Sequence, residues 1–485
     1  MIKLNVNKIA MIAILFSTWT GCIIYGNDTT ALSLSHTLLR AMQNNPLVKI
    51  ERINTDAAVS ILRENRYTYE PQIEFSYSTS KQDSIDFSES NQMSLSIYET
   101  LPTGTNIKLW GEAVPLSSAL KSATGASYQN NVGFTITQSL LRGVNPAVNL
   151  APLRKVRIDV ELREEELTGY AQKFLMDAER AYWDLSLSGE EVKIYRYSLE
   201  LVQRFLYEAE ERLKTGSIAA IDLAAIRAEA ASRERQLFDA ATAYKQKILY
   251  LAYIMNAPEY WSVNAVITDT IMSLGKADAL EEHIEAARRF RPDFRQAALQ
   301  AKKGELDLAY TKNGLLPKLD FFISLRETSY AESFSEALTP KDPEGIITGG
   351  FTLQFPLTSG ASREKYRRAA YSIEQQKLSI ENFSHLLEYE VRSAHIEVLR
   401  AATQIETAKT VSALQQQKLD AEQEKLNVGK STGYAVLQVQ RDFVSANLDE
   451  ARARTSYIYA LLSLYFRDGT LLLRRGIKPM DTIFE

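Results

Sequence analysis

Two long stretches of this sequence contain no proline, residues 153–257 and 357–478. Proline breaks the interior of a helix, so stretches of this length permit very long helices. Glycine is sparse in both, and their apolar residues recur at alternating steps of three and four. That spacing keeps one seam of a helix against a partner helix, as in a coiled coil. A helix of about 60 residues is on the order of 90 Å long, so the sequence predicts an elongated protein.

Shorter segments with strict alternation precede each helical stretch. Residues 72–79 and 132–137 alternate apolar with polar or small side chains before the first stretch, and residues 319–325 and 351–355 do so before the second. Residues 93–111 continue the pattern, as further strands or as a longer loop. Period-two alternation predicts strands with one apolar face. Such strands suit a membrane barrel, and they suit a soluble antiparallel hairpin equally well.

The order helix, strands, long helix, glycine turn, helix occurs twice in the chain. One offset relates Pro46 to Pro292 and Pro71 to Pro317, and a second relates LKTG at 213–216 to LNVG. Constant offsets of this kind indicate a structural repeat. We expect one repeat at 27–256 and another at 281–470, with a linker or equatorial segment at 257–280 and a C-terminal tail at 471–485. Within them we expect strands at about 71–140 and 317–357 and long helical hairpins at about 150–256 and 360–468, with tips near Gly216 and Gly429.

The N-terminus has the layout of an export signal. Lys3 and Lys8 precede an apolar run at 9–16 that is too short to span a bilayer, so we expect a signal peptide in residues 1–26. Two cleavage points compete. One lies after Gly26. The other lies before Cys22, where the sequence resembles the end of a lipoprotein signal and the cysteine would be acylated.

Composition excludes several classes of function. The chain has 56 Lys and Arg against 60 Asp and Glu, so it is not a strongly basic binder of nucleic acid. One cysteine excludes a disulfide framework, and four histidines leave little material for a metal site or for acid–base catalysis. Residues 429–433 end like a phosphate-binding loop, but Glu424 stands where the first glycine of that motif is required. We therefore expect neither an enzyme, nor a cofactor, nor a metal.

In its motifs and in their order, the sequence resembles the TolC-type outer-membrane efflux channel family over essentially the whole mature chain. The resemblance implies a mainly helical fold with a membrane β-barrel portion: a trimer that shares one barrel above a coiled-coil helical tunnel, in the outer membrane and extending into the periplasm. It rests on the strand-to-helix junctions QSLLRG (138–143) and QFPLTSG (354–360), on NPAVNLAPLR (145–154) and AYWDL (181–185), and on the turns LKTGSIAAID (213–222) and LNVGKSTGYA (426–435).

A single chain has too few strands to close a membrane barrel, so several chains would have to share one barrel. We count about four to six strands per chain, whereas a small membrane barrel needs about eight to close. In lipid, an open sheet edge leaves backbone groups without partners. One chain therefore cannot close a barrel alone.

The resemblance also assigns roles to the turns between the long helices. It implies that they dock on a periplasmic adaptor (membrane fusion) protein, and that the channel narrows beside them. Asp222, Tyr434 and Gln438 are the candidate constriction residues, although Asp222 could equally serve only its helix. The candidate adaptor contacts are Leu213, Lys214, Thr215, Gly216, Ser217, Leu426, Val428, Gly429, Lys430 and Ser431.

The resulting hypothesis is a passive channel subunit of a tripartite efflux or type I secretion system. An inner-membrane pump of the RND or ABC type would supply the energy through the adaptor. The other partners would be two further copies of the chain and outer-membrane lipid, with no nucleic acid. The alternative is a periplasmic coiled-coil structural or adaptor protein without a pore.

Overall fold

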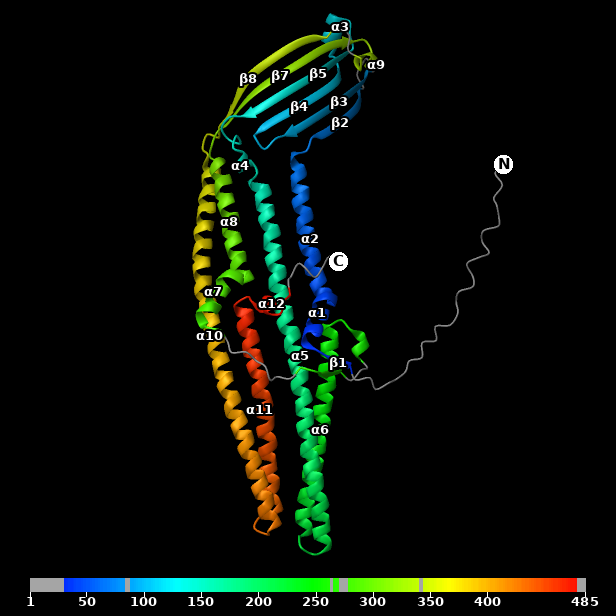
Figure 1. Ribbon diagram of the computed structural model, residues 1–485. Coiled ribbons are helices and arrows are strands. Elements are labelled where there is room, and N and C mark those ends of the chain that lie inside the picture. Colours follow the sequence, from blue (N-terminus) through cyan, green and yellow to red (C-terminus); the bar gives the residue numbers. More distant parts are fainter. Residues whose placement is uncertain (1–29, 83–87, 262–264, 270–277, 340–342, 478–485) are drawn as a thin grey trace, which may run out of the picture.

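Four helices account for most of the length of the molecule (Figure 1). Helices α5 (Ala151–Lys214) and α6 (Ala220–Ile254) form one antiparallel hairpin, and α10 (Gly360–Asn427) and α11 (Gly433–Arg467) form the other. α5 has 64 residues and α10 has 68. Each is therefore on the order of 100 Å long, and the prediction of very long helices in the two proline-free stretches is confirmed. The computed structural model describes residues 30–82, 88–261, 265–269, 278–339 and 343–477.

The upper half of the molecule is a single layer of helices. Its members pack in the order α2, α5, α8 and α10, where α2 is Pro46–Arg66 and α8 is Pro292–Asn313. Both α2 and α8 begin with proline in the first turn, where the missing N–H and the fixed φ of proline suit a helix start. The short helices α1 (Leu34–Asn44) and α7 (Leu280–Phe290) precede them, so the two repeats enter this layer in the same way.

A six-stranded antiparallel sheet caps the helix layer (Figure 1). The strand order is β2-β3-β4-β5-β7-β8. Residues 93–111 thus belong to two strands rather than to a loop, so the first repeat contributes four strands and the second repeat two. The strands are β2 (Gln72–Gln82), β3 (Ser88–Thr100), β4 (Thr105–Pro115), β5 (Tyr128–Ser139), β7 (Lys318–Ala331) and β8 (Glu344–Gln354).

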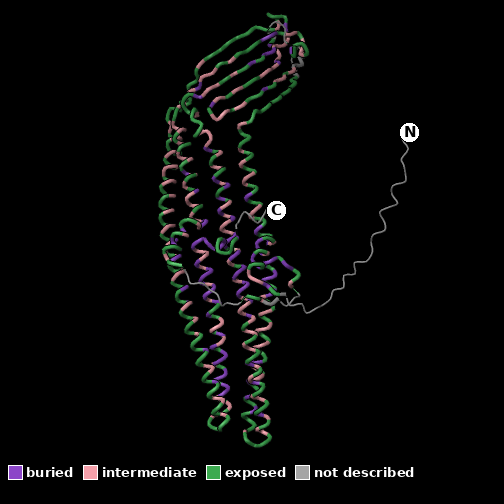
Figure 2. The backbone as a smooth tube through the Cα atoms, in the orientation of Figure 1, coloured by how far each residue is buried: buried purple, intermediate pink, exposed green. Residues whose placement is uncertain are grey.

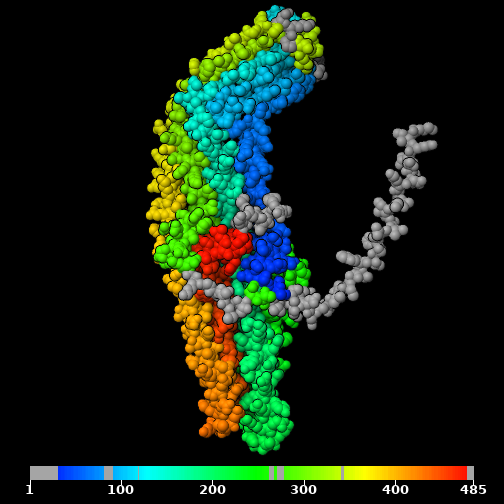
Figure 3. All heavy atoms as spheres, in the orientation of Figure 1, coloured from blue at the N-terminus to red at the C-terminus, as the bar shows by residue number. Residues whose placement is uncertain are grey.

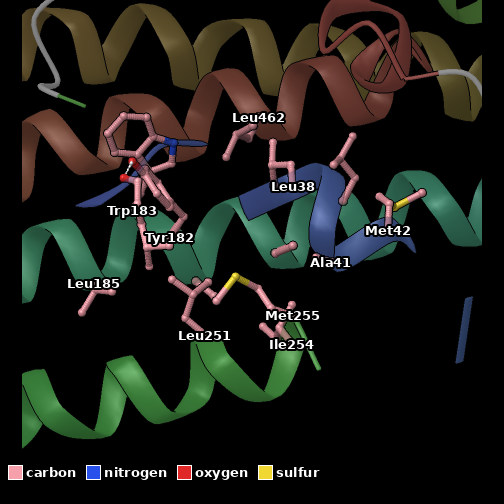
Figure 4. Close-up of a cluster of buried hydrophobic side chains, with 14 of the residues drawn as sticks. Leu38, Ala41, Met42, Tyr182, Trp183, Leu185, Leu251, Ile254, Met255 and Leu462 are labelled. Atoms are coloured by element: carbon pink, nitrogen blue, oxygen red, sulfur yellow. Dashed lines mark hydrogen bonds between the residues drawn. The ribbon is translucent and has the colours of Figure 1, made fainter. Parts of the chain in front are cut away.

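The largest buried core lies midway along the rod, as the purple segments in Figure 2 show. Here α1 packs against α5, α6 and the end of α11 (Figure 4). Tyr182 is fully buried, and its hydroxyl lies 3.0 Å from the carbonyl oxygen of Leu32 and 2.6 Å from Oδ2 of Asp269. Tyr182 and Trp183 are thus packing residues. In Figure 3 the last described part of the chain (red) lies beside α1 (blue) at this level.

Short elements complete the described part of the chain, in which no helix combines the length and apolar character needed to cross a bilayer. They are β1 (Thr30–Leu32), which pairs in parallel with β6 (Ala265–Ile267), η1 (Tyr67–Tyr69), α3 (Ser118–Thr124), α4 (Pro146–Asn149), η2 (Pro258–Trp261), α9 (Phe334–Ala337) and α12 (Leu471–Arg474).

Candidate functional site

One face of the sheet is apolar across all six strands. Side chains alternate between the faces of a strand, so the strand register decides which residues share a face. Many of these apolar side chains are exposed: Ile73 is 70% exposed, Ile347 78% and Phe351 69%. An exposed apolar surface of this extent marks contact with lipid or with a partner. The register places Phe75 opposite Leu95, Ile97 opposite Leu109, Phe134 opposite Leu325, and Phe321 opposite Phe351.

The other face of the sheet is polar. Hydroxyl groups bridge neighbouring strands there, as between Ser76 and Ser94 at 2.8 Å and between Thr135 and Ser324 at 3.0 Å. Near the outer end, Asn131 accepts a hydrogen bond from Thr328 and donates one to Glu112, at 2.9 and 3.0 Å. A sheet with one lipid-like face and one hydrated face can separate a membrane from water.

Aromatic side chains on the polar face cover two glycines. A Cβ atom at Gly133 would lie 2.6 Å from the indole of Trp110, its partner across the strands. Similarly, a Cβ at Gly350 would lie 3.1 Å from the ring of Phe322. The two glycines let these rings lie flat on the sheet, so the rings project little from the polar face.

Both lateral edges of the molecule are open within the described residues. β2 and β8 are the end strands of the sheet, and α2 and α10 are the end members of the helix layer. Each end strand is continuous in sequence with the end helix beside it. The two edge helices expose apolar side chains: Leu47, Ile53 and Ile61 on α2, and Leu378, Tyr389 and Ile396 on α10.

The two hairpins end in turns of the same design. Gly216 follows α5 with φ +74°, and Gly429 follows α10 with φ +75°, a backbone conformation that glycine adopts without strain. Both turns are therefore Schellman motifs, the usual glycine-based end of a helix. Each is closed by two backbone hydrogen bonds: Ser217 N–H to Arg212 O (2.8 Å) and Gly216 N–H to Leu213 O (3.0 Å), and Lys430 N–H to Lys425 O (2.7 Å) and Gly429 N–H to Leu426 O (3.1 Å).

A groove of about 980 Å³ separates the two hairpin ends. Phe205, Ile226 and Leu437 contribute apolar surface to it. A Cβ atom at Gly433 would lie 2.9 Å from Cζ of Phe205, so glycine is needed there for the ring to pack. Seven of the predicted tip and constriction residues line this groove: Gly216, Ser217, Asp222, Leu426, Gly429, Ser431 and Tyr434.

The three candidate constriction residues do not all reach this groove. Asp222 is exposed in the first turn of α6, where a carboxylate suits the helix dipole. Tyr434 is 69% exposed, and Gln438 is exposed one turn further along α11. The structure therefore brings Asp222 and Tyr434 to one groove without Gln438. The predicted residues outside the groove are Leu213, Lys214, Thr215, Val428, Lys430 and Gln438.

An ion-pair cluster above the groove joins the two hairpins, and it was not predicted from the sequence. The side chains of Glu229 and Arg233 on α6 are only 8% and 6% exposed, and their Oε1 and Nη2 atoms are 2.8 Å apart. Arg441 on α11 donates to the other oxygen of Glu229, with Nε at 3.2 Å. The signal was present in the sequence, since Glu229 and Arg233 follow Leu223 and Ile226 at the spacing of an apolar helix seam.

The electrostatics of this cluster keep the Glu229 carboxylate ionised. Burial alone would raise the pKa of Glu229. The hydrogen bond from Arg441 and the charges of Arg233 and Arg441 outweigh burial, so the pKa lies below its ordinary value. Removing one partner of such a cluster leaves a buried charge unpaired, which is strongly destabilising.

Comparison with known proteins identifies this architecture. The family model described as outer membrane efflux protein matches residues 283–470. The matched part of the chain, residues 283–470, belongs to the outer membrane efflux protein family. No curated protein matches the sequence.

Solved channel structures share the fold of this efflux protein along nearly its whole length. The outer membrane channel CmeC of Campylobacter jejuni is 14% identical with a TM-score of 0.67, covering 93% of this chain and 87% of its own. VceC of Vibrio cholerae is 12% identical with a TM-score of 0.68, covering 90% and 96%. The open state of MtrE of Neisseria gonorrhoeae is 14% identical with a TM-score of 0.63, covering 90% and 88%.

These findings confirm several predictions for the efflux protein. The family, the mainly helical fold with antiparallel strands, the role as an outer-membrane efflux channel rather than an enzyme, and the location in the outer membrane and periplasm are all confirmed. The predicted export signal and the acylation site Cys22 lie outside the described residues. The repeat boundaries and the roles of the tip residues stay predictions.

Proposed function

We propose that this efflux protein is one subunit of a homotrimeric, passive channel in a tripartite export system. One observation carries the proposal: the apolar face of the sheet runs without interruption to two open edges, each continuous with an open edge of the helix layer. In lipid, the free N–H and C=O groups of β2 and β8 would lack hydrogen-bond partners. Copies of the same chain satisfy both edges by pairing β8 of one subunit with β2 of the next.

The same side-by-side assembly closes the helix layer. α2 of one subunit would meet α10 of its neighbour, and their exposed apolar stripes would then be buried against each other. The result is a barrel with its apolar face in the outer membrane, standing on a helical tunnel in the periplasm. The polar face of the sheet would line the pore.

The hairpin ends are the proposed docking site for a periplasmic adaptor (membrane fusion) protein. Their groove is lined by apolar side chains together with hydroxyl and charged groups, which suits the end of a helical hairpin. We place the adaptor contacts at Gly216, Ser217, Leu426, Gly429 and Ser431, with the outer turn residues at the rim. Asp222, Tyr434 and Gln438, exposed one or two turns above, are the proposed constriction.

Energy for export would come from an inner-membrane pump of the RND or ABC type. The phosphate-loop-like residues 429–433 form the turn between two helices, whereas such a loop needs a strand before it. Export through the channel is then passive. In a tripartite efflux system or in a type I secretion system, the adaptor would meet the same hairpin ends.

Single-channel recording in planar bilayers tests the channel. The purified protein should insert and give discrete conductance steps, which rise when Glu229→Gln loosens the hairpin ends. A photo-crosslinker at Ser217 or Ser431 should capture the adaptor, while one at Leu387, which is buried in the helix layer, should not. A protein that extracts without detergent and never conducts would be a structural protein instead.

A further inference from the structure

The first repeat carries an extra strand pair in the middle of the sheet. Pro71 opens β2 and Pro317 opens β7, while the similar junctions at Gln138 and Gln354 end β5 and β8. β2 therefore corresponds to β7, and β5 to β8. β7 and β8 pair directly, whereas β3 and β4 separate β2 from β5. The second repeat thus shows what the first would be without the hairpin at 88–115.

The two faces of this hairpin match those of the strands beside it, as expected for part of a barrel wall. Its outward residues Leu95, Ile97 and Leu109 continue the apolar face. Its inward residues continue the polar face, where Ser94 bonds Ser76 and Glu112 bonds Asn131. A loop folded into the pore or lying on the membrane would not match both faces of its neighbours in register.

We infer that the hairpin is part of the barrel wall and widens the transmembrane pore. Strands lie about 4.8 Å apart and tilt by about 45° in membrane barrels, so six strands are about 41 Å wide and four only about 27 Å. The added strand pair therefore lengthens the barrel circumference by about half.

The outer end of the sheet is consistent with an unobstructed pore. Phe334 of α9 packs on Tyr77 and Tyr128, with ring centroids 6.2 and 5.6 Å away. Tyr77 and Tyr128 belong to the apolar face, because Tyr77 pairs with Met93 and Tyr128 with Ala331. α9 is therefore held on the outside of the sheet and away from the pore.

The inference rests on the proposed trimer, and the barrel width tests it. Three subunits give a barrel about 39 Å across between backbones, against about 26 Å with four strands each. The probe is the full-length protein carrying Thr348→Cys on the polar face, treated from the outer side with maleimide-linked polyethylene glycols of graded size. The largest reagent that labels the thiol should be about 1.5-fold wider than the largest one that labels the same cysteine in a variant lacking residues 88–115. Ile347→Cys, on the apolar face, is the matched control and should resist these water-soluble reagents.

Electron microscopy of the purified assembly keeps the test decisive if the deletion variant does not assemble. Eighteen strands in the wall support the inference. Twelve strands, with 88–115 folded inside or outside the wall, overturn it, as would an equal size limit in the two backgrounds. An assembly without any continuous pore would overturn the proposed function and this inference with it.

Discussion

The Nε atom of Arg441 lies 3.2 Å from Oε2 of Glu229, and this contact joins two helices whose residues are 212 positions apart in the chain. It connects the hairpin of the first repeat to that of the second just above their ends. Arg452 and Glu191 make a second connection of the same kind, at 2.9 Å between Nη2 and Oε1. Separation of the hairpin ends has to break such pairs. Removing their partners should therefore favour the open channel.

Substitutions at the two partners of this contact should differ in how much stability they cost. Glu229→Gln leaves Arg233 charged and buried, so we expect a loss of about 3 kcal/mol of stability and a higher resting conductance. Arg441 is 53% exposed, so Arg441→Gln should cost at most about 1 kcal/mol while still raising conductance. Thermal unfolding and bilayer recordings measure the two effects. Arg235→Gln, which removes an exposed cation that forms no ion pair among the described residues, is the control and should change neither. Equal costs for Glu229→Gln and Arg441→Gln would contradict the burial argument.

Acid should weaken the same contact. The pKa of Glu229 lies below its ordinary value of 4.5, because the arginines outweigh the effect of burial. A lowered pKa stabilises the folded protein fully above pH 4.5, and this stabilisation is lost as the pH falls through the lowered pKa. We expect the difference in melting temperature between the wild type and Glu229→Gln to be constant near neutral pH and to shrink below pH 4.5. A difference that shrinks already near neutral pH would argue against an ionised Glu229.

Two glycines of similar φ should tolerate alanine very differently. Gly104 has φ +79°, and a Cβ atom there would overlap the carbonyl oxygen of Gly143. Gly125 has φ +73° and open space around it. Gly125→Ala should cost about 1 kcal/mol from backbone conformation alone, whereas Gly104→Ala should add a steric cost of about 1–3 kcal/mol. The yield of assembled protein and its thermal stability should rank the two. Equal behaviour would mean that the β3–β4 turn does not contact the strand-to-helix junction.

Adjacent residues of β8 test the two faces of the sheet. Ile347 lies on the apolar face opposite Leu325, and Thr348 lies on the polar face opposite Ser324. Ile347→Lys should cost about 2–4 kcal/mol in a bilayer and reduce insertion, whereas Thr348→Lys should insert normally and shift the ion selectivity of the pore. Insertion is measured by heat-modifiable mobility or protease protection, and selectivity by reversal potentials. The reverse order would invert our assignment of the faces.

Replacing the glycine at either hairpin end should lower the stability of the protein by the same amount. A Cβ atom at Gly216 or at Gly429 would have no neighbouring atom within 4 Å, so alanine costs only the backbone conformation, about 1 kcal/mol at each site. Asparagine should cost less, because it adopts positive φ more readily. Gly433→Ala is the steric contrast, since its Cβ would meet Phe205 at 2.9 Å. Melting temperatures of these variants check the ranking, and a Gly433→Ala protein as stable as the Gly216→Ala protein would contradict it.

Local patterns in the sequence predicted a large part of this fold. The absence of proline and the three-and-four spacing predicted the long helices, and alternation predicted the strands that begin near Pro71 and Pro317. The turns at Gly216 and Gly429 were predicted because a helix end of this kind needs a residue at positive φ. These features depend on neighbours within a few residues, so a single sequence contains the information.

The features that join distant parts of the chain depend on tertiary packing. The pairing of β3 and β4 between β2 and β5 depends on cross-strand contacts, which alternation alone does not specify. The contact between Glu229 and Arg441, and the separation of Gln438 from the groove that holds Asp222 and Tyr434, depend on how two hairpins rotate against each other. Sequence periodicity fixes which face of a helix is apolar, but the partner of that face is chosen by packing across the whole molecule.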